Sequence, residues 1–377
     1  MGGESRRLGL YTDLYELRMT ESYLRAGMTR DATFSLYIRP TRERPWFIAA
    51  GVFRVLELLD AFRYGPDELA YLRSLGFRDE TLDYLGSLTA SGEVWAVADG
   101  TLVLGDEPIL EITAPLPFGQ LIETAVINLV HYPTLVATKA ARVANAAGGR
   151  NVVDFGFRRA HGLETGVEAA LAAYIGGALT TSNVEAGRRY AIPVVGTMAH
   201  SFVQSFPHEI DAFRAFAADH PESVTLLVDT YDTLAGVRNA IVVAREMAGR
   251  GETLRAVRLD SGDVQALARA SRRLLDDAGL RDVQIFASGG LDEYDVAALV
   301  DAGAPIDGFG VGTDLVTSAD RPAVDIAYKL VAYDGRPVAK FSADKASLPG
   351  AKQYFATAAL RTTRSVCATR STPAAVC

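Results

Sequence analysis

The chain has 377 residues, enough for two domains or for one barrel with attachments, and 49% of them are hydrophobic. A formal net charge of −8 argues against nucleic-acid binding as the main role, and no apolar run is long enough to span a membrane. No apolar signal-peptide region follows Met1, and the two cysteines, Cys367 and Cys377, lie near the C-terminal end. A fold that needs no disulfide fits a cytoplasmic enzyme.

The first third of the chain is expected to mix helices with a small β-rich region. Thr12 or Asp13 can cap a helix whose apolar stripe starts at Leu14, and residues 33–38 alternate as a strand does. Three further helices are expected at 54–62, 67–75 and 79–88, three strands at 93–97, 101–104 and 109–113, and a long helix at 119–147. This long helix is either continuous or broken near Pro133.

From Asn151 onwards, short apolar strands alternate with amphipathic helices. The expected strands lie at residues 152–155, 178–181, 193–197, 224–228, 254–259, 283–287 and 306–310. These units predict either a parallel barrel that is close to complete or an open doubly wound sheet. Two more strands, at 328–333 and 337–341, are expected to rejoin the β-rich region, and residues 358–377 have the composition of a disordered tail.

Each strand of the second half is followed by a polar or glycine-rich cluster. These clusters lie at residues 154–159, 181–183, 196–200, 229–232, 258–262, 288–290 and 310–313. Because the carboxyl ends of parallel strands meet at one edge, the clusters predict a site there that suits an anionic ligand with hydroxyl groups.

Two glycine-containing pairs, Gly289-Gly290 and Gly312-Thr313, are the best phosphate candidates. Glycine lets backbone N–H groups approach an anion, and a following helix adds partial positive charge. The alternative is an ordinary turn between strand and helix. His200 lies just beyond the third strand; a lone histidine is more often a packing residue, but these neighbours favour a functional role.

Two arginine-containing segments add charge to this edge. Arg258 and Asp260 alternate with a leucine, so both side chains point to one side of their strand. They can bind a phosphate and either sugar hydroxyls or Mg²⁺, although a mutual salt bridge is an equal alternative. Arg158 and Arg159 beside Phe155 suit a planar aromatic anion; the alternative is a surface pair of arginines.

Two other features lie outside the strand ends. Lys340, Ser342 and Lys345 belong to a basic, hydroxyl-rich loop that can clamp nucleotide phosphates, although a solvated lysine run is the more common interpretation. Tyr11 and Tyr15 are four residues apart on one helix face, where core packing is the simpler explanation.

Taken together, these residues resemble the nicotinate phosphoribosyltransferase family. The matching motifs are TDLY at 12–15, DFGFRRA at 154–160, SNVEAG at 182–187, GTMAHSF at 196–202, LVDTYD at 227–232, VRLDSG at 257–262, FGVGTDLVT at 309–317, KLV at 329–331 and PG at 349–350. The ordered series covers roughly residues 9–355 and is highly specific.

The resemblance implies an α/β fold in which an irregular, incomplete TIM-like barrel joins a smaller α/β sandwich built from both chain ends. On that basis residues 1–118 form the N-terminal part of the sandwich and 119–327 the barrel with its connecting helix. Residues 328–357 return to the sandwich, and 358–377 form an atypical tail. The resemblance also implies a homodimer with shared active sites, located in the cytoplasm.

The implied reaction joins nicotinate to phosphoribosyl pyrophosphate in the salvage of NAD, with ATP as a co-substrate and Mg²⁺ as a cofactor. The nitrogen of nicotinate attacks C1′, and pyrophosphate leaves through an oxocarbenium-like transition state. Positioning and Mg²⁺-aided departure then matter more than a strong nucleophile. The sequence does not identify the metal ligands.

The resemblance also implies roles for individual residues. His200 matches a histidine that ATP phosphorylates, and Asp229 matches the carboxylate that orients its ring. Phe155 and Tyr15 resemble the two aromatic residues that enclose the pyridine ring, with Tyr15 coming from the other subunit.

The remaining implied roles concern charged and hydroxyl groups. Arg158 or Arg159, together with Arg258, would hold the carboxylate and phosphates, and Asp260 the ribose. The glycine-containing pairs at 289–290 and 312–313 would hold the 5′-phosphate. Ser182 occupies the position where a nicotinamide-specific relative carries an Asp, which favours the acid.

One departure from the family is the segment after residue 352, which is rich in Thr, Ala, Arg and Ser where further sandwich strands and helices are usual. It puts the stability of the small domain in doubt more than the barrel site. Two alternatives stay open: a nicotinamide-specific phosphoribosyltransferase, and a catalytically silent ligand-binding paralogue. The presence of His200, Asp229, Arg258 and Asp260 argues against the silent paralogue.

Overall fold

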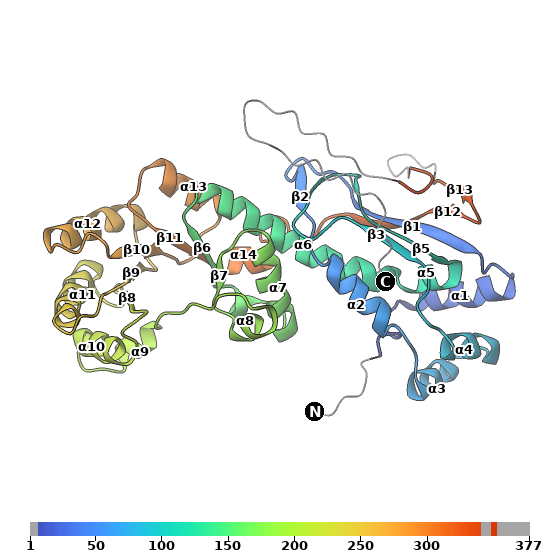
Figure 1. Cartoon of the computed structure of the whole chain (residues 1–377), viewed down its shortest axis with the longest axis horizontal. Coiled ribbons are helices and arrows are strands. Elements are labelled where there is room, and N and C mark those ends of the chain that lie inside the picture. The colour runs from blue at the N-terminus through green and yellow to red at the C-terminus, as the bar shows by residue number, and fades with distance from the viewer. Residues whose placement is uncertain (1–6, 341–347, 353–377) are drawn as a thin grey trace.

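The computed structural model describes residues 7–340 and 348–352, and contains two large sheets joined by a long helix, α6 (Figure 1). The predicted positions Ser342 and Lys345 and the tail at 358–377 lie outside the described residues. The two sheets differ in direction: one is antiparallel and the other is parallel.

The antiparallel sheet has the strand order β13-β12-β1-β5-β3. Its strands are β1 (Asp31–Ile38), β3 (Glu93–Ala96), β5 (Pro108–Pro115), β12 (Ile326–Tyr333) and β13 (Arg336–Pro337). The central strand β1 pairs with β5 on one side and with β12 on the other, so segments from both ends of the chain share one sheet. A separate pair consists of β2 (Trp46–Ile48) and β4 (Leu102–Leu104).

Five helices pack with this antiparallel sheet: α1 (Leu14–Arg25), α2 (Val52–Ala61), α3 (Pro66–Ser74), α4 (Asp79–Gly86) and α5 (Leu116–Leu121). At the start of helix α1, the Glu16 carboxylate accepts from the backbone N–H of Asp13 at 3.0 Å, and the Asp13 carbonyl accepts from the backbone N–H of Glu16 at 3.1 Å. In the core, the rings of Phe34 and Tyr328 are stacked at 4.8 Å, so a strand from each chain region contributes to the same apolar layer.

Helix α6 (Glu123–Ala146) runs unbroken through Pro133, whereas the break lies before it, between α5 and α6. A proline cannot donate to the carbonyl four residues earlier, which is that of Leu129. Gly51 packs against this carbonyl so closely that a Cβ there would lie 2.0 Å from the Leu129 oxygen. Of the two alternatives expected for this helix, the continuous one is observed at Pro133.

The parallel sheet has the order β7-β6-β11-β10-β9-β8 and forms a curled, incomplete barrel. Its strands are β6 (Asn151–Asp154), β7 (Thr180–Thr181), β8 (Thr225–Leu227), β9 (Ala256–Leu259), β10 (Gln284–Ala287) and β11 (Gly308–Val311). The strand expected at 193–197 is reduced to one parallel bridge between Thr181 and Val194. The expected fold class, an irregular barrel with a smaller α/β part, is confirmed, and the open doubly wound sheet is not.

Helices follow the parallel strands on the outside of the curled sheet (Figure 1). They are α7 (Leu163–Ile175), α8 (Val184–Tyr190), α9 (His200–Gln204), α10 (Glu209–Asp219), α11 (Thr233–Ala248), α12 (Val264–Asp277), α13 (Glu293–Asp301) and α14 (Thr313–Thr317), with a short 3-10 turn η1 (Phe157–Arg159). Asn183, Asp232, Asp263 and Asp292 cap the helices that they precede, which fixes the turn at each strand end. Within residues 7–340 and 348–352, no helix combines the length and apolarity needed to cross a membrane.

Candidate active site

Arg258, on β9, is the centre of the polar groups at the carboxyl edge of the parallel sheet. Its guanidinium donates to the hydroxyls of Ser288 at 2.8 Å and Thr197 at 2.9 Å, and to the Asp260 carboxylate at 2.6 Å. The side chain is only 14% exposed. Three fixed acceptors hold the guanidinium plane in one orientation, so a cation faces the site in a defined place.

Asp260 lies directly after β9 and links Arg258 to the histidine of the site. One carboxylate oxygen accepts from Arg258 and, at 2.5 Å, from Ser288; the other lies 3.7 Å from Nε2 of His200. Burial alone would raise the pKa of the Asp260 carboxyl, but the Ser288 hydroxyl and the Arg258 charge outweigh it and lower the pKa. Asp260 is therefore an anion at neutral pH.

His200 is the first residue of α9 and is 42% exposed on its side chain. Its Nδ1 lies 3.1 Å from the Thr230 hydroxyl, while Nε2 faces Asp260. The predicted contact between the ring and Asp229 is not made in this structure, because Asp229 points elsewhere. The residue that follows it, Thr230, holds the ring instead.

Asp229 stabilises the loop after β9. Its Oδ2 accepts from the backbone N–H of Asp260 at 2.8 Å and from the Ser261 hydroxyl at 2.7 Å. Its Oδ1 is buried and has no hydrogen-bond partner among the described residues. A buried carboxylate oxygen without a partner has unused capacity to accept a hydrogen bond or bind a cation.

Phe155, directly after β6, forms the apolar wall of the site. The Arg258 guanidinium carbon lies 5.4 Å from the centre of its ring, and Phe286 packs against the ring at 6.1 Å. A Cβ on Gly310 would lie 2.5 Å from the Phe155 ring. A Cβ on Gly312 would lie 3.2 Å from the Phe155 carbonyl oxygen, so both glycines leave space for Phe155. An aromatic face next to a fixed cation suits a planar anionic ring.

The loop with Gly289 and Gly290 lies against Asp260. Both residues have positive φ, of 96° and 71°, and a Cβ on Gly289 would lie 1.9 Å from the Asp260 carbonyl oxygen. Gly290 has open space around its Cα. The second predicted phosphate loop, at Gly312 and Thr313, directly follows the neighbouring strand β11, and Thr313 is exposed.

Behind Phe155, Asp154 is 3% exposed and accepts from Thr181 at 2.8 Å and from the backbone N–H of Gly156 at 2.8 Å. Burial raises the pKa of the Asp154 carboxyl. Ser182 donates its backbone N–H to the Asp154 carbonyl and is half-buried, so it lies beside the turn that carries Phe155.

Arg158 and Arg159 form the η1 turn beyond Phe155, and both are exposed. Neither makes an ion pair or side-chain hydrogen bond with another residue of the described chain. Two cations without protein partners at the rim of the site are available to an anionic ligand.

Two predicted residues are not brought to this edge. Tyr15 is on α1, beside the antiparallel sheet, and is 46% exposed. Lys340 follows β13 of the same sheet and is also exposed. Within one chain, the site therefore contains the barrel residues but neither of these two.

Four residues of the site had no role assigned by sequence reasoning: Thr197, Thr230, Ser261 and Ser288. All four are hydroxyl residues within the predicted polar clusters, and each contacts a charged or imidazole side chain. Their position inside the polar clusters was the only available signal, because short hydroxyl side chains are common in loops.

The carboxylates of the site suit a cation for which water and substrate supply most of the ligands. Within the described residues, no group of three or more His, Cys, Asp and Glu side chains could hold a metal ion. Asp229, with its unpartnered buried oxygen, and Asp260 are two carboxylates on adjacent loops. Mg²⁺ commonly uses one or two carboxylates together with waters and phosphate oxygens, so the site fits this ion.

The chain matches two family models. Residues 10–131 match the nicotinate phosphoribosyltransferase (NAPRTase) N-terminal domain, and residues 150–365 match the nicotinate phosphoribosyltransferase (NAPRTase) family. It is 51% identical over 348 residues to a nicotinate phosphoribosyltransferase of Mycobacterium tuberculosis, which covers 92% of this chain and 75% of that protein. A nicotinate phosphoribosyltransferase of Bacillus subtilis is 42% identical over 364 residues, covering 94% and 74% of the two chains.

Solved structures share this fold. The crystal structure of human nicotinic acid phosphoribosyltransferase superposes with a TM-score of 0.79 at 31% identity, covering 87% of this chain and 75% of that one. A nicotinate-nucleotide pyrophosphorylase from Pyrococcus furiosus superposes with a TM-score of 0.76 at 27% identity, covering 94% and 82%.

Proposed function

Because the chain belongs to the nicotinate phosphoribosyltransferase family, we propose that it transfers the phosphoribosyl group of phosphoribosyl pyrophosphate to nicotinate. The C1′–oxygen bond to pyrophosphate breaks, and the ring nitrogen of nicotinate forms the new bond to C1′. The products are nicotinate mononucleotide and pyrophosphate, a step of NAD salvage. The observation that carries this proposal is the fixed Arg258 beside the ring of Phe155.

The arrangement supports catalysis by positioning. Nicotinate stacks on Phe155, with the cations of Arg258 and of the η1 arginines near its carboxylate. The Asp260 carboxylate accepts from ribose hydroxyls and lies where positive charge develops on the ribose. The reacting nitrogen and C1′ are thereby held together, which removes much of the entropic barrier.

A role for ATP is a finer part of the proposal. His200 is exposed at the rim, Thr230 holds Nδ1, and Nε2 faces the site. If Thr230 accepts the Nδ1 proton, Nε2 has a lone pair for the γ-phosphate of ATP, and ADP leaves. Hydrolysis of the phosphohistidine then regenerates the unmodified imidazole of His200 and releases inorganic phosphate.

Mg²⁺ is the proposed cofactor. Asp229 and Asp260 would hold it together with substrate oxygens and water. When bound, the ion neutralises charge on the departing pyrophosphate. The residues of the chain orient the ring, the ribose and the histidine.

We further propose that the enzyme acts as a homodimer with shared sites. Tyr15, together with Tyr11 and Leu14, is exposed on α1, far from the strand ends of the barrel in the same chain (Figure 1). Large apolar side chains that are exposed together are typical of a surface that contacts another molecule. Tyr15 of a second subunit is the proposed partner of Phe155 across the pyridine ring.

The decisive experiment is turnover of phosphoribosyl pyrophosphate with nicotinate or nicotinamide, each with and without ATP. We expect nicotinate to be used at least about tenfold better in kcat/KM, because each hydrogen bond to a charged carboxylate is worth roughly 1.5–3 kcal/mol. Product is measured as the corresponding mononucleotide. Preference for nicotinamide would assign the chain to the amide-specific reaction, and turnover of neither pyridine would indicate a silent paralogue.

A further inference from the structure

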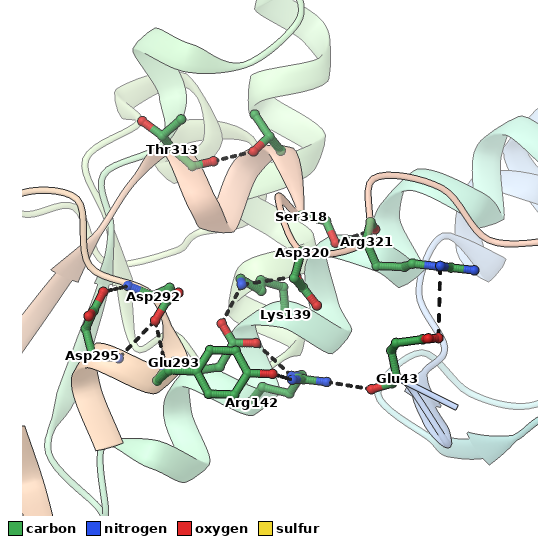
Figure 2. Close-up of polar contacts among 12 residues, drawn as sticks. Glu43, Lys139, Arg142, Asp292, Glu293, Asp295, Thr313, Ser318, Asp320 and Arg321 are labelled. Atoms are coloured by element: carbon green, nitrogen blue, oxygen red, sulfur yellow. Dashed lines mark hydrogen bonds and ion pairs between the residues drawn. The ribbon is translucent and has the colours of Figure 1, made fainter. Parts of the chain in front are cut away.

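A buried ionic cluster lies behind the site, where α6 crosses from one sheet to the other. Lys139 of α6 has no exposed surface, and its ammonium forms ion pairs with the carboxylates of Glu293 and Asp320 (Figure 2). The Asp320 contact measures 3.1 Å. Lys139 therefore connects two segments that follow different strands of the barrel.

On one side, the cluster fixes the beginning of α13. Glu293 is the first residue of that helix and its side chain is 6% exposed. Its other oxygen accepts from Nε of Arg142 at 2.8 Å, and Arg142 also donates to the Tyr294 hydroxyl at 2.9 Å. Figure 2 shows Lys139 and Arg142 approaching Glu293 from the same helix, α6.

On the other side, the cluster fixes the end of α14. Arg44, from the loop after β1, is fully buried and donates to the Asp320 carboxylate and to the Ser318 hydroxyl, each at 2.7 Å. Tyr132 of α6 donates to the Val316 carbonyl at 2.7 Å. Because α14 is only five residues long, contacts from outside must set its position.

Both connected segments begin with a candidate phosphate loop. Glu293 comes three residues after Gly290, and α14 begins with Thr313 and leads to Asp320. A displacement at either carboxylate is carried along only a few residues to the loop in front of it. Lys139 is thus a contact that the segments after both loops share.

Stability alone does not explain this arrangement. Replacing a buried ion pair by well-packed apolar side chains is often neutral or stabilising, because desolvation offsets the attraction. In some proteins, however, buried polar or ionic groups fix the register of the elements that they join. The cluster joins α6, α13, the segment after α14 and the loop after β1 at one point.

We propose that Lys139 is a positioning residue for phosphate binding, holding the Gly289–Gly290 and Gly312–Thr313 loops at the separation that one phosphate ester requires. This inference rests on the proposed function, since it takes these two loops as the phosphate site. Lys139 itself is buried behind the loops and acts through Glu293 and Asp320.

The first test is the affinity of the full-length Lys139→Met variant for ribose 5-phosphate, measured by isothermal titration calorimetry. Methionine keeps most of the side-chain length but removes the charge that both carboxylates share. We expect at least about tenfold weaker binding, because a displacement of about 1 Å at a binding group is enough for losses of that order. The KM for phosphoribosyl pyrophosphate should rise more than kcat falls.

The matched control is Arg54→Met. Arg54 of α2 forms an ion pair of 2.9 Å with Glu168 of α7, so it also connects the two parts of the fold, but through elements that follow neither loop. We expect this variant to lose some thermal stability and to bind ribose 5-phosphate as the unmodified protein does. Equal weakening in both variants would show a general effect of loosening the fold and would overturn the inference.

A double variant, Lys139→Met with Glu293→Gln, separates positioning from buried charge. The amide oxygen of Gln still accepts from Arg142, and no carboxylate is left without its lysine at Glu293. We expect the melting temperature to recover relative to Lys139→Met while ribose 5-phosphate binding stays weak. Recovery of both, or unchanged binding in Lys139→Met, contradicts the proposal.

The outcomes separate this inference from the proposed function. If the unmodified protein binds ribose 5-phosphate but transfers nothing to nicotinate, the proposed function fails and the binding comparison still decides the role of Lys139. If it makes nicotinate mononucleotide and Lys139→Met binds normally, only the positioning role fails. Absence of ribose 5-phosphate binding in the unmodified protein also overturns the positioning role, whatever the turnover shows.

Discussion

At the scale of single residues, the polar site depends on short hydroxyl side chains that hold longer charged ones. Arg258 has a salt bridge to Asp260, which is one of the two interpretations of this pair from the sequence, and it also faces Phe155; ligand binding by the pair stays a prediction. The alternation of the two residues along the chain predicted their common direction. It could not predict Thr197 or Ser288, which reach Arg258 from other loops.

For His200, too, the sequence predicted the position of the residue but not its contact partner. Its place at a strand end was predictable, but its partner was not, because Asp229 and Thr230 are consecutive and point in different directions. Asp229 accepts a hydrogen bond from Ser261 in the loop after β9. Only the folded conformation therefore decides whether Asp229 or Thr230 contacts the imidazole of His200.

The first prediction concerns His200→Asn. An amide of similar shape keeps a polar contact with Thr230 but has no nucleophilic ring nitrogen, so we expect a folded protein whose ATP hydrolysis and ATP stimulation are lost. Weak transfer without ATP should survive, since Phe155 and Arg258 are untouched. The measurement is mass spectrometry of acid-labile phosphate after incubation with ATP, together with turnover assays.

Thr230→Val is the matched control for that experiment. It keeps the imidazole but removes the hydroxyl that holds Nδ1, so phosphate incorporation should slow without disappearing. A phosphate label on a residue other than His200, or an ATP-stimulated enzyme without any label, would show that the histidine assignment is wrong.

At the scale of elements, hydrophobic periodicity predicted the alternation of strands and helices but not their lengths. The segment at 193–197 has a strand composition, yet only Val194 makes a bridge, because the sheet ends beside it. Pro133 inside α6 left a continuous and a broken helix equally open, because the packing of Gly51 against the Leu129 carbonyl involves a segment distant in sequence.

The second prediction concerns the variant Gly289→Ala. Gly289 lies where the loop after β10 packs closely against the loop after β9. The added Cβ meets the Asp260 carbonyl at 1.9 Å and has to adopt a φ of 96°, so Asp260 must move. The strained backbone alone costs about 1–2 kcal/mol. We expect a lower melting temperature and a larger loss of kcat/KM than stability accounts for, measured by calorimetry and turnover.

Gly290→Ala provides the comparison for that variant. Its φ is also positive, at 71°, but a Cβ there meets no atom within 4 Å. We therefore expect a similar backbone strain without displacement of Asp260, and a smaller loss of activity. Equal activity losses in the two variants would contradict the importance of the contact between Gly289 and Asp260.

At the scale of the whole molecule, contacts between distant segments were the least predictable. The return of β12 to the β-rich region was predicted from its strand pattern, and β12 pairs antiparallel with β1. The cluster around Lys139 did not follow, because it combines α6, two barrel segments and the loop after β1. A lysine and an arginine three residues apart on an apolar helix were its only sign in the sequence.

The distance between α1 and the barrel edge has a consequence for assembly. Tyr15 is 46% exposed and lies beside the antiparallel sheet, whereas Phe155 ends β6 of the parallel sheet (Figure 1). One chain cannot place both rings against one ligand in this conformation. Shared sites require that the α1 surface of one subunit covers the barrel edge of the other, twice in a symmetric dimer.

The third prediction tests this arrangement with mixed subunits. Tyr15→Ala removes an exposed ring, so the fold should persist, and Asp260→Asn disables the barrel edge. Each variant alone should be nearly inactive. After subunits are exchanged, a hybrid dimer has one site with an intact Tyr15 and an intact Asp260, so the equimolar mixture should recover about a quarter of the unmodified activity in a two-fold dimer. Native mass spectrometry verifies the exchange, and hybrids that form without any recovered activity would place Tyr15 outside the site of the neighbouring subunit.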